Sequence, residues 1–164
     1  MPAQHISSLP VRELDRAPML HALRLARAAA RRGEVPVGAV IVAEEQVIAA
    51  ASNRVERSRD ASAHAELVAL RQASRALGSW RLQGCTLYST LEPCPMCAGA
   101  LLLARIDRVV YGADDPRKGA YRSVYDVLAN PGGNHHPEVT PGCEAAGATA
   151  LLQQFFQRIR TERS

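Results

Sequence analysis

Two short segments, His64-Ala65-Glu66 and Pro93-Cys94-Pro95-Met96-Cys97, constrain the fold of this chain more than any other feature. Together they offer one imidazole and two thiolates, which is a ligand set that suits zinc. Because 26 residues (67 to 92) separate the segments, the fold has to bring them together across space. Three protein ligands leave one position of a tetrahedral zinc open, which is typical of catalytic rather than structural sites. We therefore predict one zinc ion held by His64, Cys94 and Cys97.

Glu66 stands two residues after the predicted ligand His64, and the zinc does not need it as a ligand. We predict that Glu66 takes a proton from the water that the metal activates and passes protons to the substrate. Zinc lowers the pKa of a bound water to about 7, so a nearby carboxylate only has to move protons over short distances. Glu66 is therefore the predicted catalytic residue.

A structural zinc site and a redox pair of cysteines are the two alternatives for these segments. A structural site needs a fourth ligand, yet His135 and His136 lie in a distant loop, and Cys85 stands in a predicted strand. A redox pair would have no need of the His-x-Glu segment. A catalytic metal site explains both segments at once.

Length and composition indicate one domain, with a loose tail over residues 1–12 and the domain over residues 13–164. No apolar run is long enough to span a bilayer and no secretory leader is visible, so we expect a cytoplasmic protein with no membrane partner. The chain carries 20 Lys and Arg against 16 Asp and Glu. This balance permits nucleic acid binding without establishing it, since a GC-rich genome also produces Arg-rich chains.

Apolar periodicity and turn residues predict alternating helices and strands. Helices are expected over residues 15–32, 62–77, 95–104 and 144–160, and strands over 37–42, 47–51, 85–90, 108–112 and 138–140. Such alternation is typical of an α/β fold, here a three-layer α/β/α sandwich with a mixed, mostly parallel five-stranded sheet. The helix starts at His64 and Cys94 would then open at the same sheet edge. Residues 53–61 are expected to form a loop.

The motif pair is the known signature of zinc-dependent nucleobase deaminases, and further segments extend the resemblance over roughly residues 15–160. These segments are Glu34-Val35-Pro36-Val37-Gly38-Ala39-Val40, Asn53-Arg54, Leu70-Arg71, Thr90-Leu91-Glu92, Ala98-Gly99-Ala100, Arg105-Ile106, Arg108-Val109-Val110-Tyr111-Gly112-Ala113, Asp126-Val127-Leu128, Asn134-His135 and Phe155-Phe156. The chain resembles the bacterial tRNA adenosine deaminases, within the cytidine-deaminase-like superfamily.

The resemblance implies a zinc-dependent homodimer, with one zinc per subunit, that converts adenosine to inosine at the wobble position of a tRNA anticodon loop. It also implies that Asn53 contacts the flipped-out base and that Asp115 lies in a loop touching the neighbouring nucleotides. His135 is expected to face the RNA. From the residues alone, Asn53 could equally be a turn residue and Asp115 a solvated charge beside Asp114.

Three departures from the family pattern surround the expected RNA surface. Asp114 stands where a basic residue is common, Tyr121-Arg122 where two small residues are common, and Ala146-Gly147-Ala148 near where an acidic residue is common. Two other functions therefore stay open. One is a deaminase of a free purine base, nucleoside or related amino-heterocycle, distinguished by the size of its substrate. The other is a silent RNA-binding partner subunit, which the presence of Glu66 disfavours.

Overall fold

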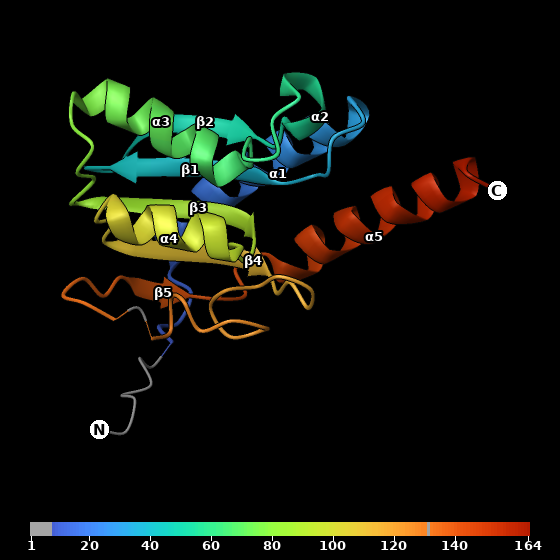
Figure 1. Cartoon of the computed structure of the whole chain (residues 1–164). Coiled ribbons are helices and arrows are strands. Elements are labelled where there is room, and N and C mark those ends of the chain that lie inside the picture. Colours follow the sequence, from blue (N-terminus) through green and yellow to red (C-terminus); the bar gives the residue numbers. More distant parts are fainter. Residues whose placement is uncertain (1–7, 131) are drawn as a thin grey trace.

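Helices cover both faces of a five-stranded sheet in the computed structural model, which describes residues 8–130 and 132–164 (Figure 1). The strands are β1 (Gly38–Ala43), β2 (Gln46–Ser52), β3 (Cys85–Leu91), β4 (Arg108–Ala113) and β5 (Glu138–Thr140). The helices are η1 (Glu13–Asp15), α1 (Arg16–Arg31), α2 (Val55–Ser58), α3 (Ala65–Leu77), α4 (Pro95–Leu103) and α5 (Ala145–Glu162). The predicted α/β/α sandwich is confirmed.

The strand order is β2-β1-β3-β4-β5. β1 pairs antiparallel with both β2 and β3, whereas β3–β4 and β4–β5 are parallel. Four of the five strands thus run in the same direction and β1 alone runs against them, so the sheet is mixed, as predicted. The cause is the α3 crossover, which carries the chain from β2 over β1, so that β1 lies between two strands that run the opposite way.

Alternate residues of the central strands enter two separate cores. On one face Ile41, Leu87 and Val109 pack among the residues of α3 and α4. On the other face Val40, Tyr88 and Val110 pack against α1. A strand buried on both faces needs apolar residues at successive positions, which explains why β1 and β4 read as continuous apolar runs.

The contact between α1 and β1 is close enough to require glycine. A Cβ atom at Gly38 would lie 1.9 Å from the carbonyl oxygen of Ala22 on α1. The Gly38 N–H donates to Thr90 Oγ1 at 3.1 Å, which ties the start of β1 to the end of β3. This packing fixes the edge of the sheet at which β3 ends.

The short helix α2 lies in the segment that was predicted to be a loop. The buried carboxylate of Glu34 accepts hydrogen bonds from the N–H groups of Glu56 (3.2 Å) and Arg57 (2.7 Å), and so caps this helix. The cap stands more than 20 residues away in sequence, which is why local patterns did not reveal the helix.

Residues 1–7 of the predicted tail lie outside the described residues. Residues 8–12 run beside β5, where the Leu9 N–H donates to the Val139 carbonyl at 3.0 Å. This part of the tail is therefore attached to the domain. Among the described residues, no helix combines the length and the apolar character that a membrane crossing requires.

A buried ion pair joins the start of α1 to β4. Arg108 donates from Nη1 and Nη2 to the two carboxylate oxygens of Asp15, at 2.6 and 2.8 Å, and Asp15 also accepts from the Tyr88 hydroxyl at 2.9 Å. Burial by itself would raise the pKa of Asp15. The hydrogen bonds from Arg108, the Arg12 N–H and Tyr88 outweigh burial and lower the pKa of Asp15 below its ordinary value of 3.8.

We expect this pair to make the fold sensitive to acid. A carboxyl whose pKa is lower in the folded than in the unfolded chain stabilises the fold above its unfolded pKa, and this stabilisation is lost as pH falls through the folded pKa. Urea unfolding from about pH 6 to about pH 3 should therefore show a falling free energy of unfolding below pH 3.8. Asp15→Asn should flatten this decline. A variant with the slope of the wild type would contradict the assignment.

Candidate active site

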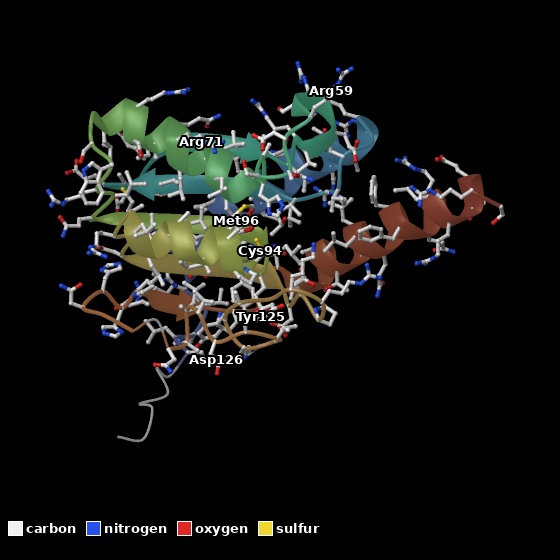
Figure 2. The ribbon with its side chains drawn as sticks, in the orientation of Figure 1. Arg59, Arg71, Cys94, Met96, Tyr125 and Asp126 are labelled. Carbon is white, nitrogen blue, oxygen red and sulfur yellow. The ribbon has the colours of Figure 1, made fainter. Side chains whose placement is uncertain are left out.

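The three predicted metal ligands meet at the edge of the sheet where β3 and β4 end. His64 is the residue before the first turn of α3, and Cys94 holds the same position before α4. Cys97 lies one turn further along α4 and is fully buried. Figure 2 shows Cys94 at the end of α4 that faces this edge. Both helices therefore present their positive N-terminal ends to the site, which favours thiolate forms of cysteine.

The distances among the ligand atoms fit a tetrahedral zinc. His64 Nδ1 lies 3.5 Å from the sulfur atoms of both Cys94 and Cys97, and the three ligand atoms lie within 4.8 Å of one another. Zn–N and Zn–S bonds of about 2.0 and 2.3 Å at a tetrahedral angle place the nitrogen and sulfur atoms about 3.5 Å apart. The donor set and its spacing thus match this metal.

The two thiols are electrostatically unequal. The pKa of Cys94 is lowered to about 4. The largest cause is the hydrogen bond with Cys97; burial acts in the opposite direction, and the hydrogen bond with His64 lowers the pKa further. The pKa of Cys97 is raised, first by the same hydrogen bond and then by burial. Without metal the cysteines therefore share one proton, which a cation bound between them would displace.

Glu66 lies beside this cluster, in the first turn of α3. Its side chain is buried, and Cys97 Sγ stands 3.7 Å from Glu66 Oε2. Burial raises the pKa of Glu66 above its ordinary value of 4.5. A raised pKa makes the carboxyl a stronger base, which suits a group that takes up and then returns protons.

Ser89 on β3 is a site residue that the sequence did not reveal. Its hydroxyl lies 2.8 Å from the Leu91 carbonyl oxygen and 3.2 Å from Glu66 Oε1. The single hydroxyl hydrogen can be donated to either of these oxygen atoms. Ser89 therefore holds Glu66 in position, and its hydrogen bond opposes the effect of burial on the pKa of Glu66.

Asn53 follows β2 and lies on the same side of the fold. Its backbone N–H donates to the Val37 carbonyl at 3.0 Å. Its side chain is buried, with 7% of the residue exposed, and its Oδ1 atom has no hydrogen-bond partner among the residues that the structure describes. A buried amide oxygen without a partner costs free energy, and a bound polar ligand would satisfy it.

Asp115 lies in the loop that follows β4. Its Oδ1 atom accepts from the N–H groups of Arg117 (2.9 Å) and Lys118 (3.3 Å), which fixes the turn of this loop. The pKa of His64 is raised, first by its hydrogen bond with Cys94, and the positive charge of Lys118 acts in the opposite direction, so this loop lies within electrostatic range of the predicted metal ligands.

Two of the departures from the family pattern lie in this loop and are neighbours in space. Arg122 Nη2 lies 3.5 Å from the Asp114 carboxylate, and the Tyr111 hydroxyl donates to Asp114 at 3.1 Å. Tyr121 packs edge-on against Tyr111, with 6.0 Å between the ring centres. The acidic and basic substitutions therefore compensate each other. At the third departure, Gly147 lies on α5 beside Leu23 of α1.

His135 is not brought to the metal cluster. Its Nε2 atom lies 2.6 Å from the carbonyl oxygen of Ile106, just before β4 begins. The metal cluster lies beyond the other end of the strands, so His135 and Glu66 occupy opposite edges of the sheet. A contact between His135 and RNA stays a prediction, and it would have to be made at a distance from the reacting base.

Comparison with known proteins places this geometry among deaminases. The MafB19-like deaminase family matches residues 15–160. A tRNA-specific adenosine deaminase from Bacillus subtilis (strain 168) is 42% identical over 149 residues, which cover 91% of this chain and 92% of that protein.

Solved structures show the same likeness. One, from a study of A-to-I editing by tRNA:A34 deaminases at the wobble position of transfer RNA, superposes with a TM-score of 0.80 at 45% identity and covers 83% of this chain and 99% of its own. A guanine deaminase from Nitrosomonas europaea superposes with a TM-score of 0.71 at 28% identity, covering 91% of this chain and 86% of its own.

Proposed function

Because this chain belongs to the MafB19-like deaminase family, we propose that it is a zinc-dependent hydrolase that converts adenosine to inosine at the wobble position of tRNA anticodon loops. The observation that carries this proposal is the buried carboxyl of Glu66 beside a three-ligand cluster that fits zinc. The relatives named as tRNA deaminases, similar over nearly their whole length, support the choice of substrate.

The chemistry follows from the positions of these side chains. His64, Cys94 and Cys97 would hold the zinc, which supplies a Lewis acid that lowers the pKa of water to about 7. Glu66 takes one proton from the attacking water and delivers it to the ring nitrogen while the C–O bond forms. It then takes the second proton from the hydroxyl group now on the ring carbon and delivers it to the amine, so that the C–N bond breaks. Water is consumed and ammonia is released, so no other reactant is needed.

Asn53 supports a nucleobase as the group bound beside Glu66. Its unpartnered Oδ1 atom is an acceptor that a purine N–H can fill, and its side-chain N–H₂ can donate to a ring nitrogen or carbonyl. A base reaches such a recessed site only when it leaves its stack, which costs least in an unpaired loop. An anticodon loop meets this condition.

The function is tested by incubating zinc-loaded protein with an anticodon stem-loop that carries adenosine at the wobble position. Free adenosine, adenine, guanine and cytidine are treated in parallel, and the exchange of an amine for a carbonyl is followed by mass. Conversion of the stem-loop alone is expected. Conversion of guanine or another small molecule alone would instead favour the second candidate, a deaminase of a free purine. The likeness to solved guanine deaminases is the reason for including guanine. No conversion of any substrate would favour a silent RNA-binding subunit.

The outward face of α4 supports a homodimer as the working form. Met96 and Leu103 on this face are 40% and 73% exposed, and Ala100 lies between them at helical spacing. Beside them, a groove of about 450 Å³ between α3 and α4 is lined by Leu67, Leu70, Arg71, Ser74, Arg75 and Ala100. A second copy of the chain would cover this apolar surface. In a two-fold dimer the same patch of both copies meets, so one continuous patch is enough to form the interface.

We expect Leu103→Glu to convert a dimer into a monomer. A charge buried at the centre of an apolar interface costs about 2 kcal/mol or more, which weakens association at least roughly 30-fold. Light scattering at micromolar concentration measures the change, with Val47→Glu on the exposed part of β2 as the control. A wild-type protein that is monomeric at this concentration would refute the dimer.

A further inference from the structure

Glu92 carries a buried carboxylate that the chemistry described so far does not use. It is the first residue after β3, and 1% of it is exposed. Its side chain points into the loop of residues 114–123 that follows β4, which we call the substrate loop because it carries Asp115. Among the described residues, the hydrogen bonds to this carboxylate come from that one loop.

The substrate loop surrounds both carboxylate oxygens with donors. Oε1 accepts from the Asp115 N–H at 3.1 Å and from the Ser123 hydroxyl. Oε2 accepts from the N–H groups of Tyr121 (3.0 Å), Arg122 (3.2 Å) and Ser123 (3.2 Å). The donors come from both ends of the loop, so a single carboxylate fixes where the loop leaves the sheet and where it returns.

The middle of the loop also closes onto Glu92. A Cβ atom on Gly119 would lie 2.3 Å from the Glu92 carboxylate carbon, so the backbone rests directly on the side chain. The next residue, Ala120, donates its N–H to the Pro93 carbonyl at 2.9 Å. The loop is thus held against the segment that leads into the metal ligand Cys94.

We propose that Glu92 positions the substrate loop, and that it thereby sets where Asp115 and Lys118 stand relative to the zinc site. Glu92 is a positioning residue: it contacts the loop and does not touch the reacting base. This inference rests on the proposed function, since it assigns the loop to the nucleotides beside the target adenosine. The exposed residues of the loop then bind RNA in an arrangement that the buried carboxylate imposes.

Glutamine is a sharp test of this role because the amide cannot replace the carboxylate in either orientation. Two donors face one oxygen and three face the other. A side-chain N–H₂ placed on either side would therefore oppose at least two donors. Gly119→Ala attacks the same contact from the loop side without changing Glu92.

The experiment compares Glu92→Gln and Gly119→Ala with the wild type in three measurements. These are zinc content, hydrogen exchange of residues 114–123 against that of α3, and the kinetics of stem-loop deamination. Asp107→Asn is the matched control, because the Asp107 carboxylate also accepts a backbone N–H, that of Gly84 at 2.9 Å, at the opposite end of the sheet.

We expect both variants to bind zinc as the wild type does, to exchange faster within the loop only, and to raise KM at least roughly tenfold with kcat nearly unchanged. The control should show none of these effects. Normal loop exchange and normal KM in both variants would overturn the proposal. A wild type that leaves the stem-loop unmodified overturns the proposed function, and with it the RNA role of the loop, while the exchange data still test whether Glu92 holds the loop.

Discussion

Glu66→Gln should retain zinc and lose almost all turnover. The amide keeps the size of the carboxyl and can still contact Ser89, so the cluster of His64 and the two cysteines should persist. It can neither accept nor release a proton at the required pH. General acid–base catalysis contributes about 10²- to 10⁴-fold, and Glu66 is proposed to serve more than one transfer, so we expect a loss near the upper end.

The decisive comparison is kcat for the stem-loop together with zinc per chain. Glu56→Gln, on the exposed surface of α2, controls for the chemical change itself. Ser89→Ala should give an intermediate loss, since it removes a contact that orients Glu66 but leaves its proton in place. A Glu66→Gln protein with full zinc and near-normal turnover would end the assignment of Glu66 as the proton carrier.

The largest effect on stability is expected from Arg108→Met. The side chains of Arg108 and Asp15 are 5% and 0% exposed, so removal of the guanidinium leaves a buried carboxylate without its main partner. Breaking a buried ion pair in this way costs about 3–5 kcal/mol. At a urea dependence of about 2 kcal/mol per M, the unfolding midpoint should fall by roughly 2 M.

The chain offers its own control for this change. Arg122 and Asp114 form an ion pair whose side chains are 51% and 52% exposed, and pairs of this kind contribute about 0–1 kcal/mol. Arg122→Met should therefore shift the midpoint far less than Arg108→Met. Equal shifts would show that burial does not set the strength of the Asp15–Arg108 pair. The double variant Asp15→Asn, Arg108→Met should regain part of the loss, because no charge is then left unpaired.

The residues that the sequence located best are those whose chemistry depends on side-chain type and spacing. Imidazole, thiolate and carboxylate stand at fixed intervals in His64-x-Glu66 and Cys94-x-x-Cys97, and the structure brings all four side chains together. The helices and strands on which they stand were likewise predicted from apolar periodicity.

Glu92 shows why other parts were not predicted. Four of the five donors that the described part of the chain supplies to it are backbone N–H groups. Any residue except proline supplies such a group, so the contact leaves no pattern in residue types. The Asp114–Arg122 pair was visible only as two separate departures, because seven residues of irregular loop (115–121) lie between them. Whether β3 pairs with β1 or with β2 depended on which side of the hairpin the α3 crossover passed, and local periodicity does not record that choice.

The buried carboxylate at the base of the substrate loop also bears on how this protein could be re-engineered. Because Glu92 and Gly119 determine the path of the loop from inside, the outward side chains of Asp114, Arg117, Lys118 and Arg122 can change while the backbone path is kept. A mutant library restricted to those outward positions should contain mostly folded, zinc-binding proteins that differ in the nucleic acid they accept. A library that also includes Glu92 and Gly119 should contain mostly proteins with an unformed loop.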